Sequence, residues 1–140
     1  INPAPRRTAR MTADTLGNIY LYLGDPNSTL LSLGATGQER WRVQHAQPAS
    51  SLAPWMETGN GCLLYMLDSD GAINIYNSAD GALLHQTTVY AGGRRSSSPR
   101  ARLLEANAAE QVVIGSGFLS LVTLDAAALV DGALDRCLLG

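Results

Sequence analysis

The sequence predicts an all-β fold made of three repeats of one four-stranded antiparallel unit. Short apolar runs dominate the chain, and Gly or Asp-Gly interrupts them before a helix could complete three turns. One sequence motif is also repeated, since LLSLGATGQERW at residues 30–41 resembles AINIYNSADGALLH at residues 72–85. The late turn of each repeat contains one glycine, and these glycines, which are 44 and 51 residues apart, are Gly37, Gly81 and Gly132.

Each repeat is expected to hold four strands in the same order. The first strands are expected at residues 8–13, 51–56 and 100–105, and the second at 19–23, 63–67 and 112–114. The third strands are expected at residues 30–33, 72–76 and 119–124, and the fourth at 39–43, 82–89 and 133–139. β-rich runs separated by turn residues are typical of antiparallel hairpins.

The connections have their own sequence signals. The dipeptides Asp70-Gly71 and Asp80-Gly81 predict two-residue hairpins, because they supply the positive φ angles that such turns require. Residues 24–27, Gly-Asp-Pro-Asn, predict a longer loop. The alanine-rich residues 124–134 predict an enlarged hairpin loop with one helical turn, which accounts for the longer spacing of the third repeat.

A repeat of about 40 to 50 residues is the period of a β-propeller blade. We therefore expect residues 1–140 to form a single propeller-like segment, with blades at about residues 8–45, 48–91 and 98–140. Closed propellers have about four to eight blades, so three blades predict a partial or open propeller. The ring would be completed by further sequence, by another chain or by self-association.

The segment SLGATGQERW resembles the repeat signature of the PQQ-like, or quinoprotein-like, β-propellers. In that family a small residue and a turn are followed by Thr-Gly, a polar pair and a Trp that docks onto the neighbouring blade. The matching residues of this chain are Leu33, Ala35, Thr36, Gly37 and Trp41, whereas Gly34 stands where the family commonly has Asp. The likeness in outline covers about residues 10–139.

The other two repeats keep less of this signature. The second keeps Ala79-Asp80-Gly81 and has His85 at the position of Trp41, and the third keeps Asp131-Gly132 and has Arg136 there. The resemblance implies that Thr36, Gly37 and Trp41, together with Gly81 and Gly132, serve the docking of one blade on the next.

The chemistry of these residues agrees with a structural role. Gly37 allows a turn that a Cβ would obstruct, and the Thr36 hydroxyl is expected to bond its own backbone across that turn. Trp41 offers a large flat surface with one hydrogen-bond donor, which suits the joining of adjacent sheets. Stacking of Trp41 on a ligand is the alternative.

Composition excludes several classes of function. The net charge of −2 and the pI near 5.5 give no field that would attract nucleic acid or anionic lipid. No apolar run approaches the roughly 18 to 20 residues needed to cross a bilayer, and the polar N-terminus INPAPRRTAR has no signal-peptide core. Cys62 and Cys137 lie 75 residues apart without metal-site spacing, so each is a small packing residue or half of a disulfide.

The sequence holds no recognisable catalytic or metal constellation. His45 and His85, the two histidines, lie outside ligand spacing of each other and of any Cys, and residues 68–71 read as a hairpin turn rather than a calcium loop. The sequence therefore favours a non-catalytic binding or scaffold module without a cofactor. The resemblance implies a protein similar to the accessory propellers of bacterial envelope assemblies, and an extracytoplasmic location. The alternative is a piece of a PQQ-dependent or other cofactor-dependent oxidoreductase.

Two groups of arginines lie in the segments expected to precede blades 1 and 3. The first is Arg6, Arg7 and Arg10, and the second, in GGRRSSSPRAR, is Arg94, Arg95, Arg100 and Arg102. Each group is either a solvated loop or a contact patch for an anion or an acidic protein, because guanidinium groups pair carboxylates and phosphates in a bidentate manner.

Overall fold

The computed structural model describes residues 9–24, 28–45, 55–59, 61–67, 72–88, 101–107, 109–116 and 121–130. Blade 1 has the strands β1 (Ala9–Ala13), β2 (Ile19–Leu23), β3 (Thr29–Leu33) and β4 (Glu39–Gln44). Blade 2 has β5 (Trp55–Thr58), β6 (Leu63–Leu67), β7 (Ala72–Asn77) and β8 (Leu83–Thr88). Blade 3 has β9 (Ala101–Ala106), β10 (Gln111–Ser116) and β11 (Leu121–Asp125), followed by the short helix α1 (Ala126–Leu129).

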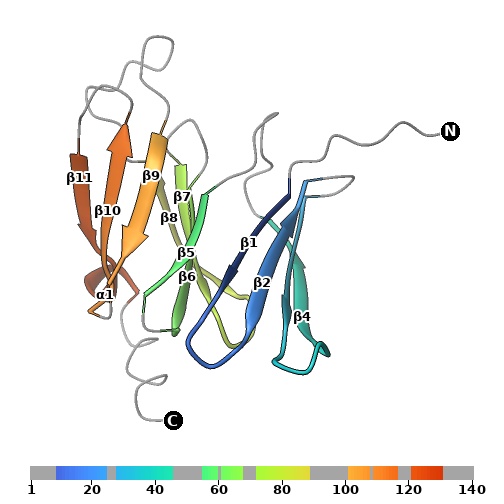
Figure 1. The fold of residues 1–140 in the computed structure, drawn as a ribbon. Coiled ribbons are helices and arrows are strands. Elements are labelled where there is room, and N and C mark those ends of the chain that lie inside the picture. The colour runs from blue at the N-terminus through green and yellow to red at the C-terminus, as the bar shows by residue number, and fades with distance from the viewer. Residues whose placement is uncertain are drawn as a thin grey trace, which may run out of the picture.

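Each blade is one antiparallel sheet whose strands pair in chain order, and the three sheets stand side by side (Figure 1). The strand β5 contacts both β1 and β9, so the first strands of the three blades are neighbours. The sheets therefore form a fan in which first strands gather along one edge. The predicted all-β fold of antiparallel propeller-like blades is confirmed.

Most predicted elements lie within one or two residues of the observed ones. The expected strands at residues 19–23 and 63–67 coincide with β2 and β6, and the expected helical turn is α1. The two-residue hairpin expected at Asp80-Gly81 is wrong, since the connection runs from Ser78 to Ala82. It is closed by hydrogen bonds from the Asn77 amide to the Ala82 carbonyl and from the Gly81 amide to the Asn77 carbonyl. The turn at residues 68–71 and the strand expected at 133–139 lie outside the described residues.

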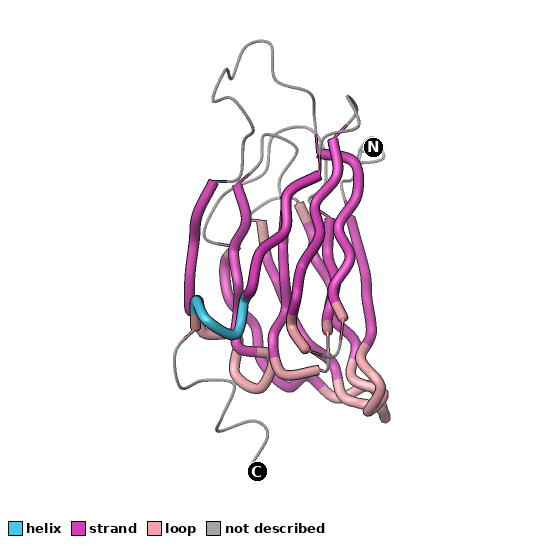
Figure 2. Tube along the Cα trace, turned by 90° about the vertical axis from the view of Figure 1, so that its left-hand side faces the viewer, coloured by secondary structure: helices cyan, strands magenta, loops and turns pink. Residues whose placement is uncertain are grey.

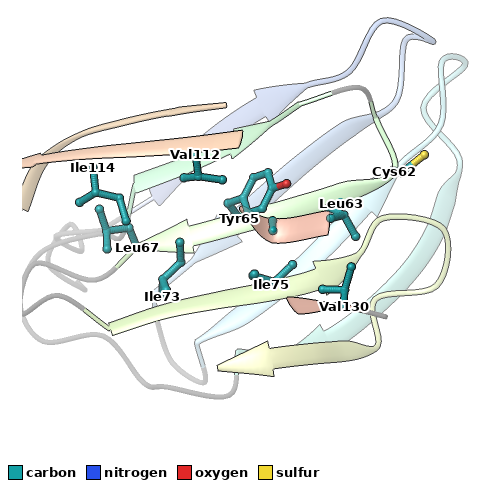
Figure 3. Packing of buried hydrophobic residues seen from close by; sticks show 10 residues of the cluster. Cys62, Leu63, Tyr65, Leu67, Ile73, Ile75, Val112, Ile114 and Val130 are labelled. Atoms are coloured by element: carbon teal, nitrogen blue, oxygen red, sulfur yellow. The ribbon is translucent and has the colours of Figure 1, made fainter. Parts of the chain in front are cut away.

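The core lies between the blades, because each sheet buries a face against its neighbour. Blade 2 is covered on both sides, and every residue of β6 is buried. Side chains of β6 alternate, so that Leu64 and Met66 pack toward blade 1 while Leu63, Tyr65 and Leu67 pack toward blade 3. Figure 3 shows the cluster between blades 2 and 3, to which blade 3 contributes Val112, Ile114 and Val130. We call the side of a blade that faces the next blade its forward face, and the other its backward face.

Three hairpins at one end of the strands share a five-residue turn (Figure 2). In the turns 14–18, 34–38 and 107–111 the amide of the first residue donates to the carbonyl of the fifth. The fourth residue of each turn has a positive φ, with values of 92° at Gly17, 90° at Gly37 and 63° at Glu110. Two positions use glycine, which adopts this conformation freely, while the third holds a glutamate there.

Cys62 follows the turn between β5 and β6 and is buried in the cluster between blades 2 and 3. Its sulfur takes part in a disulfide. The other cysteine of the sequence, Cys137, lies outside the described residues. Cys62 thus serves both of the roles that the sequence left open, packing and cross-linking.

Candidate functional site

The contact between blades 1 and 2 is built around Trp41 of β4. The indole is 8% exposed, and its Nε1–H donates to the Ser78 carbonyl in the turn between β7 and β8 at 2.9 Å. The ring lies directly on Gly81 of the same turn, since a Cβ at Gly81 would lie 2.6 Å from Cε3 of Trp41. Trp41 and Gly81 therefore form one contact between two blades.

The turn that receives Trp41 is braced from within blade 2. The Ser78 hydroxyl donates to the Gly61 carbonyl, and the Ser78 amide donates to the Cys62 carbonyl at 3.1 Å. The Ser78 carbonyl is thereby held in place for the indole. The braced turn gives the Trp41 ring a fixed surface on which to pack.

The other residues of the signature set the geometry of the turn 34–38. Gly37 has a φ of 90°, and a Cβ placed on it would meet nothing within 4 Å, so this position requires glycine for its conformation alone. The Thr36 hydroxyl donates to the Gln38 side-chain oxygen. The sequence-based expectation that the Thr36 hydroxyl bonds its own backbone differs from this, because its bond goes to the amide side chain two residues later.

A polar network beneath Trp41 was not predicted from the sequence. The Arg40 guanidinium donates to the Ser32 hydroxyl at 2.8 Å and to the Tyr20 hydroxyl at 3.3 Å, and lies 5.9 Å from the centre of the Tyr20 ring. The Tyr20 hydroxyl donates to Oδ2 of Asp14 at 2.8 Å. Burial raises the pKa of Tyr20, and its hydrogen bond to Asp14 raises it further.

Asp14 closes the turn between β1 and β2. Its Oδ1 accepts hydrogen bonds from the amides of Leu16 and Asn18 at 2.8 and 3.0 Å. Burial of the carboxyl acts to raise its pKa, but hydrogen bonds from Asn18, Tyr20 and the two amides outweigh burial, so the pKa lies below the ordinary value. The ionised carboxylate is the form that this network stabilises.

A second polar group of the contact between blades 1 and 2 involves His45, whose role between blades the sequence did not predict. His45 is buried, and a hydrogen bond of 2.7 Å joins its Nδ1 to the hydroxyl of Tyr76 in blade 2. The Tyr22 ring meets the imidazole edge-on at a centroid distance of 5.5 Å. His45 thus ties the last residues of blade 1 to β7.

Blades 2 and 3 are joined by a buried carboxylate. Glu110 is fully buried, and its Oε1 accepts a hydrogen bond from the Tyr65 hydroxyl of β6. The backbone passes close by at Gly59, where a Cβ would lie 2.5 Å from both the Asn107 carbonyl and Glu110 Oε1. Burial raises the pKa of Tyr65, and the hydrogen bond to Glu110 adds to this. Glu110 therefore has a role between blades that its sequence context did not reveal.

The remaining predicted positions contribute less to the described structure. His85 of β8 pairs with Ile75 as Trp41 of β4 pairs with Ser32, and its side chain is half-buried. Arg102 lies on β9, but its side chain is outside the description, and a further set of predicted residues lies outside the described ranges altogether: Gly132, Arg94, Arg95 and Arg100.

No family model and no curated protein sequence matches this chain. Among solved structures it is similar to the crystal structure of BamB from Moraxella catarrhalis, with a TM-score of 0.55 and 21% sequence identity. The chain folds as part of a β-propeller. The likeness covers 81% of this chain and 32% of the BamB chain, so the described blades correspond to about a third of that protein's length. At this identity the likeness establishes the fold alone.

The described residues offer no free stacking surface for the quinone cofactor of the oxidoreductase alternative. The aromatic rings of the described residues that could stack on a planar group, Tyr20, Tyr22, Trp41, Tyr65 and Tyr76, are all buried between blades. Stacking would require their packing to be opened. Among the described residues no three His, Cys, Asp or Glu side chains gather to hold a metal ion. The part of the chain that the structure describes has no helix that is both long and apolar enough to span a membrane.

Proposed function

We propose that this chain is a non-catalytic propeller module of the PQQ-like repeat type, which binds a protein partner or the remaining blades of a larger propeller. The observation that carries the proposal is the backward face of blade 1. Side chains of β1 and β2 alternate, and Tyr20 and Tyr22 pack forward onto blade 2, so Met11, Leu21 and Leu23 lie on the opposite face. Met11 is 65% exposed and Leu23 is 37% exposed.

The same face is covered in the other two blades. Leu64 and Met66 on the backward face of blade 2, and Val112 and Ile114 on that of blade 3, are all buried beneath the preceding blade. At the corresponding place in blade 1, Ile19 and Leu21 are half-buried and Leu31 is buried, but Met11 and Leu23 remain exposed. This partly exposed apolar face supports association with another surface.

An extracytoplasmic location is part of the proposal. The disulfide at Cys62 supports it, because disulfides persist in oxidising compartments and are rare in the cytosol. The resemblance of the repeat signature to envelope propellers points in the same direction.

Sedimentation velocity at low and high salt tests the proposal. Two copies can cover each other's apolar faces, so we expect concentration-dependent association that persists as salt shortens the screening length to about 3 Å at 1 M. The double variant Met11→Lys with Leu23→Lys should abolish this association. Leu16→Lys, which changes a 77% exposed leucine in a turn, should leave it intact.

A chain that stays a 14.8 kDa monomer under all these conditions would contradict the proposed role of this face. The oxidoreductase alternative has a separate test. A saturable one-to-one change in the visible spectrum on mixing with PQQ and calcium would favour it over the binding module.

A further inference from the structure

The forward face of blade 3 carries an open groove of about 530 Å³. In β10, Val112 and Ile114 pack toward blade 2, so Val113 between them lies on the opposite, forward face. Val113 pairs with Glu105 of β9 on one side and with Thr123 of β11 on the other, and Gln111 pairs with Asp125. These side chains, together with Asn107, line the groove.

This face differs from the forward faces of blades 1 and 2. In each blade the first and second strands begin to pair next to their connecting turn, at Ala13–Ile19, Thr58–Leu64 and Ala106–Val112. The residue that follows in the second strand faces forward in each blade, so the equivalent positions are Tyr20, Tyr65 and Val113. In blades 1 and 2 this position holds a tyrosine, whose large ring packs against the next blade. Blade 3 has a valine there, which leaves space above the sheet.

The surroundings of this position also become polar in blade 3. By the same register, Gln111 and Thr123 stand where blade 2 has the buried residues Leu63 and Ile75. An apolar blade face placed here would have to remove the amide, the hydroxyl and two carboxylates from water. Desolvation of an unpaired carboxylate is unfavourable, so an apolar blade face is a poor match for this groove.

The two carboxylates of the groove, Glu105 and Asp125, make no hydrogen bond or ion pair within the described part of the chain. Neither Glu105 nor Asp125 accepts a hydrogen bond or pairs with a basic side chain there, and Asp125 precedes α1 without capping it through its side chain. A third carboxylate, Glu57 of β5, interacts electrostatically with Glu105. Burial raises the pKa of Glu57, and repulsion from the charge of Glu105 raises it further. Within the part of the chain that the structure describes, the groove therefore presents negative charge without a partner for it.

We propose that this groove binds a basic segment of a protein partner, with an Arg or Lys side chain lying over Val113 and its head between Glu105 and Asp125. The hydrocarbon stem of such a side chain packs on an apolar floor while its charged head reaches polar groups. Gln111 and Thr123 supply acceptors at the rim, whereas the side-chain oxygen of Asn107 already accepts from the amides of Ala109 and Gln111. The groove volume falls within the range of about 300 to 1,000 Å³ found for ligand clefts.

This inference rests on the proposed role of the chain as a protein-binding module, but it concerns the opposite end of the fan. Sedimentation reports on the apolar face of blade 1, whereas the groove is probed by a different ligand and a different measurement. Either result can therefore fail while the other holds.

NMR titration of the ¹⁵N-labelled chain with the peptide acetyl-Gly-Arg-Gly-amide tests the proposal. Saturable shifts are expected at the amides of Val113, Thr123 and Asp125, and they should fade as salt screens the charges. The matched peptide with citrulline in place of arginine has nearly the same shape without the charge, and should cause no saturable shift. The variants Glu105→Gln and Asp125→Asn should each weaken binding about two- to five-fold, in the range of exposed ion pairs.

The variant Glu39→Gln removes an exposed carboxylate from blade 1 and should bind the peptide as the parent chain does. Thermal melts of all variants check that the fold is intact. Equal shifts with the arginine and citrulline peptides would overturn the proposal, as would no saturable shift at several millimolar peptide. Shifts at these three amides with calcium chloride alone would assign the carboxylates to a cation and would also overturn it.

Discussion

The contact between Trp41 and Gly81 predicts a specific pattern of energetic coupling. Trp41→Ala removes a nearly buried indole and its hydrogen bond to the Ser78 carbonyl, and truncation of such a ring costs about 3 to 5 kcal/mol. Gly81→Ala places a Cβ 2.6 Å from the indole and also strains a residue whose φ is 80°. The strain alone costs about 1 to 2 kcal/mol, and the clash with the ring adds to it.

The clash disappears when the ring is absent, so the two substitutions should not be additive. In the Trp41→Ala background, Gly81→Ala should cost only the conformational strain, which gives a coupling energy of about 1 to 3 kcal/mol. Trp41→Phe keeps most of the ring and leaves the Ser78 carbonyl without its donor, at a cost of about 1 to 2 kcal/mol. Gly37→Ala is the matched control, because φ at Gly37 is 90° but its added Cβ would touch nothing.

Urea unfolding followed by far-ultraviolet circular dichroism measures these free energies without depending on tryptophan emission. The expected result is that Gly37→Ala costs the same in both backgrounds while Gly81→Ala does not. An equal cost of Gly81→Ala with and without the indole would refute the inference that the ring rests on this glycine. A loss below about 1 kcal/mol for Trp41→Ala would refute its role in joining the blades.

Three further predictions concern buried polar groups. Asn74 is fully buried with both side-chain polar atoms lacking a hydrogen-bond partner among the described residues, so Asn74→Leu should raise the free energy of unfolding by about 1 to 3 kcal/mol in urea melts; a loss would mean that the amide has an essential partner. The raised pKa of Tyr65 means that the folded state keeps a proton which the unfolded state releases above about pH 10, so stability should fall as pH rises beyond that value and fall less steeply in Tyr65→Phe. The lowered pKa of Asp14 has the opposite effect on the pH dependence of stability: the stabilisation by its carboxylate is present above about pH 4 and is lost as pH falls. Asp14→Asn should therefore flatten the acid limb of the stability curve measured by thermal melts.

Local signals in the sequence were sufficient to predict most of the described strands. Glycines and Asp-Gly pairs mark the ends of β2, β3 and β7, and the apolar runs between them leave little freedom in where strands begin. The length of the turn at Asp80-Gly81 was not predictable from that dipeptide. The turn closed by the hydrogen bonds of Asn77 with Ala82 and Gly81 spans one residue more than the turn 34–38. Local composition indicates that a turn occurs and does not fix how many residues it contains.

The contacts between blades were only partly predictable, because their partners are distant in sequence. Gly37 and Gly81 occupy matching places in the repeat, yet the first is needed for its φ and the second also for the approach of Trp41, which lies 40 residues earlier. Glu110 lies 45 residues from Tyr65, and nothing near it in sequence marks it as a buried partner. Such pairs become visible only once the sheets are stacked.

The two ends of the fan have different chemistry, and this constrains what can complete it. The backward face of blade 1 presents Met11 and Leu23, whereas the forward face of blade 3 presents Glu105 and Asp125 around its groove. A ring closed by two copies placed head to tail would press the apolar face onto these carboxylates, and the described residues of that face, Met11, Leu21 and Leu23, supply no cation to replace their hydration. Association of this chain with itself is therefore expected through the blade 1 faces alone. The blade 3 end calls for a surface that the described residues of this chain do not present there, one that brings its own positive charge.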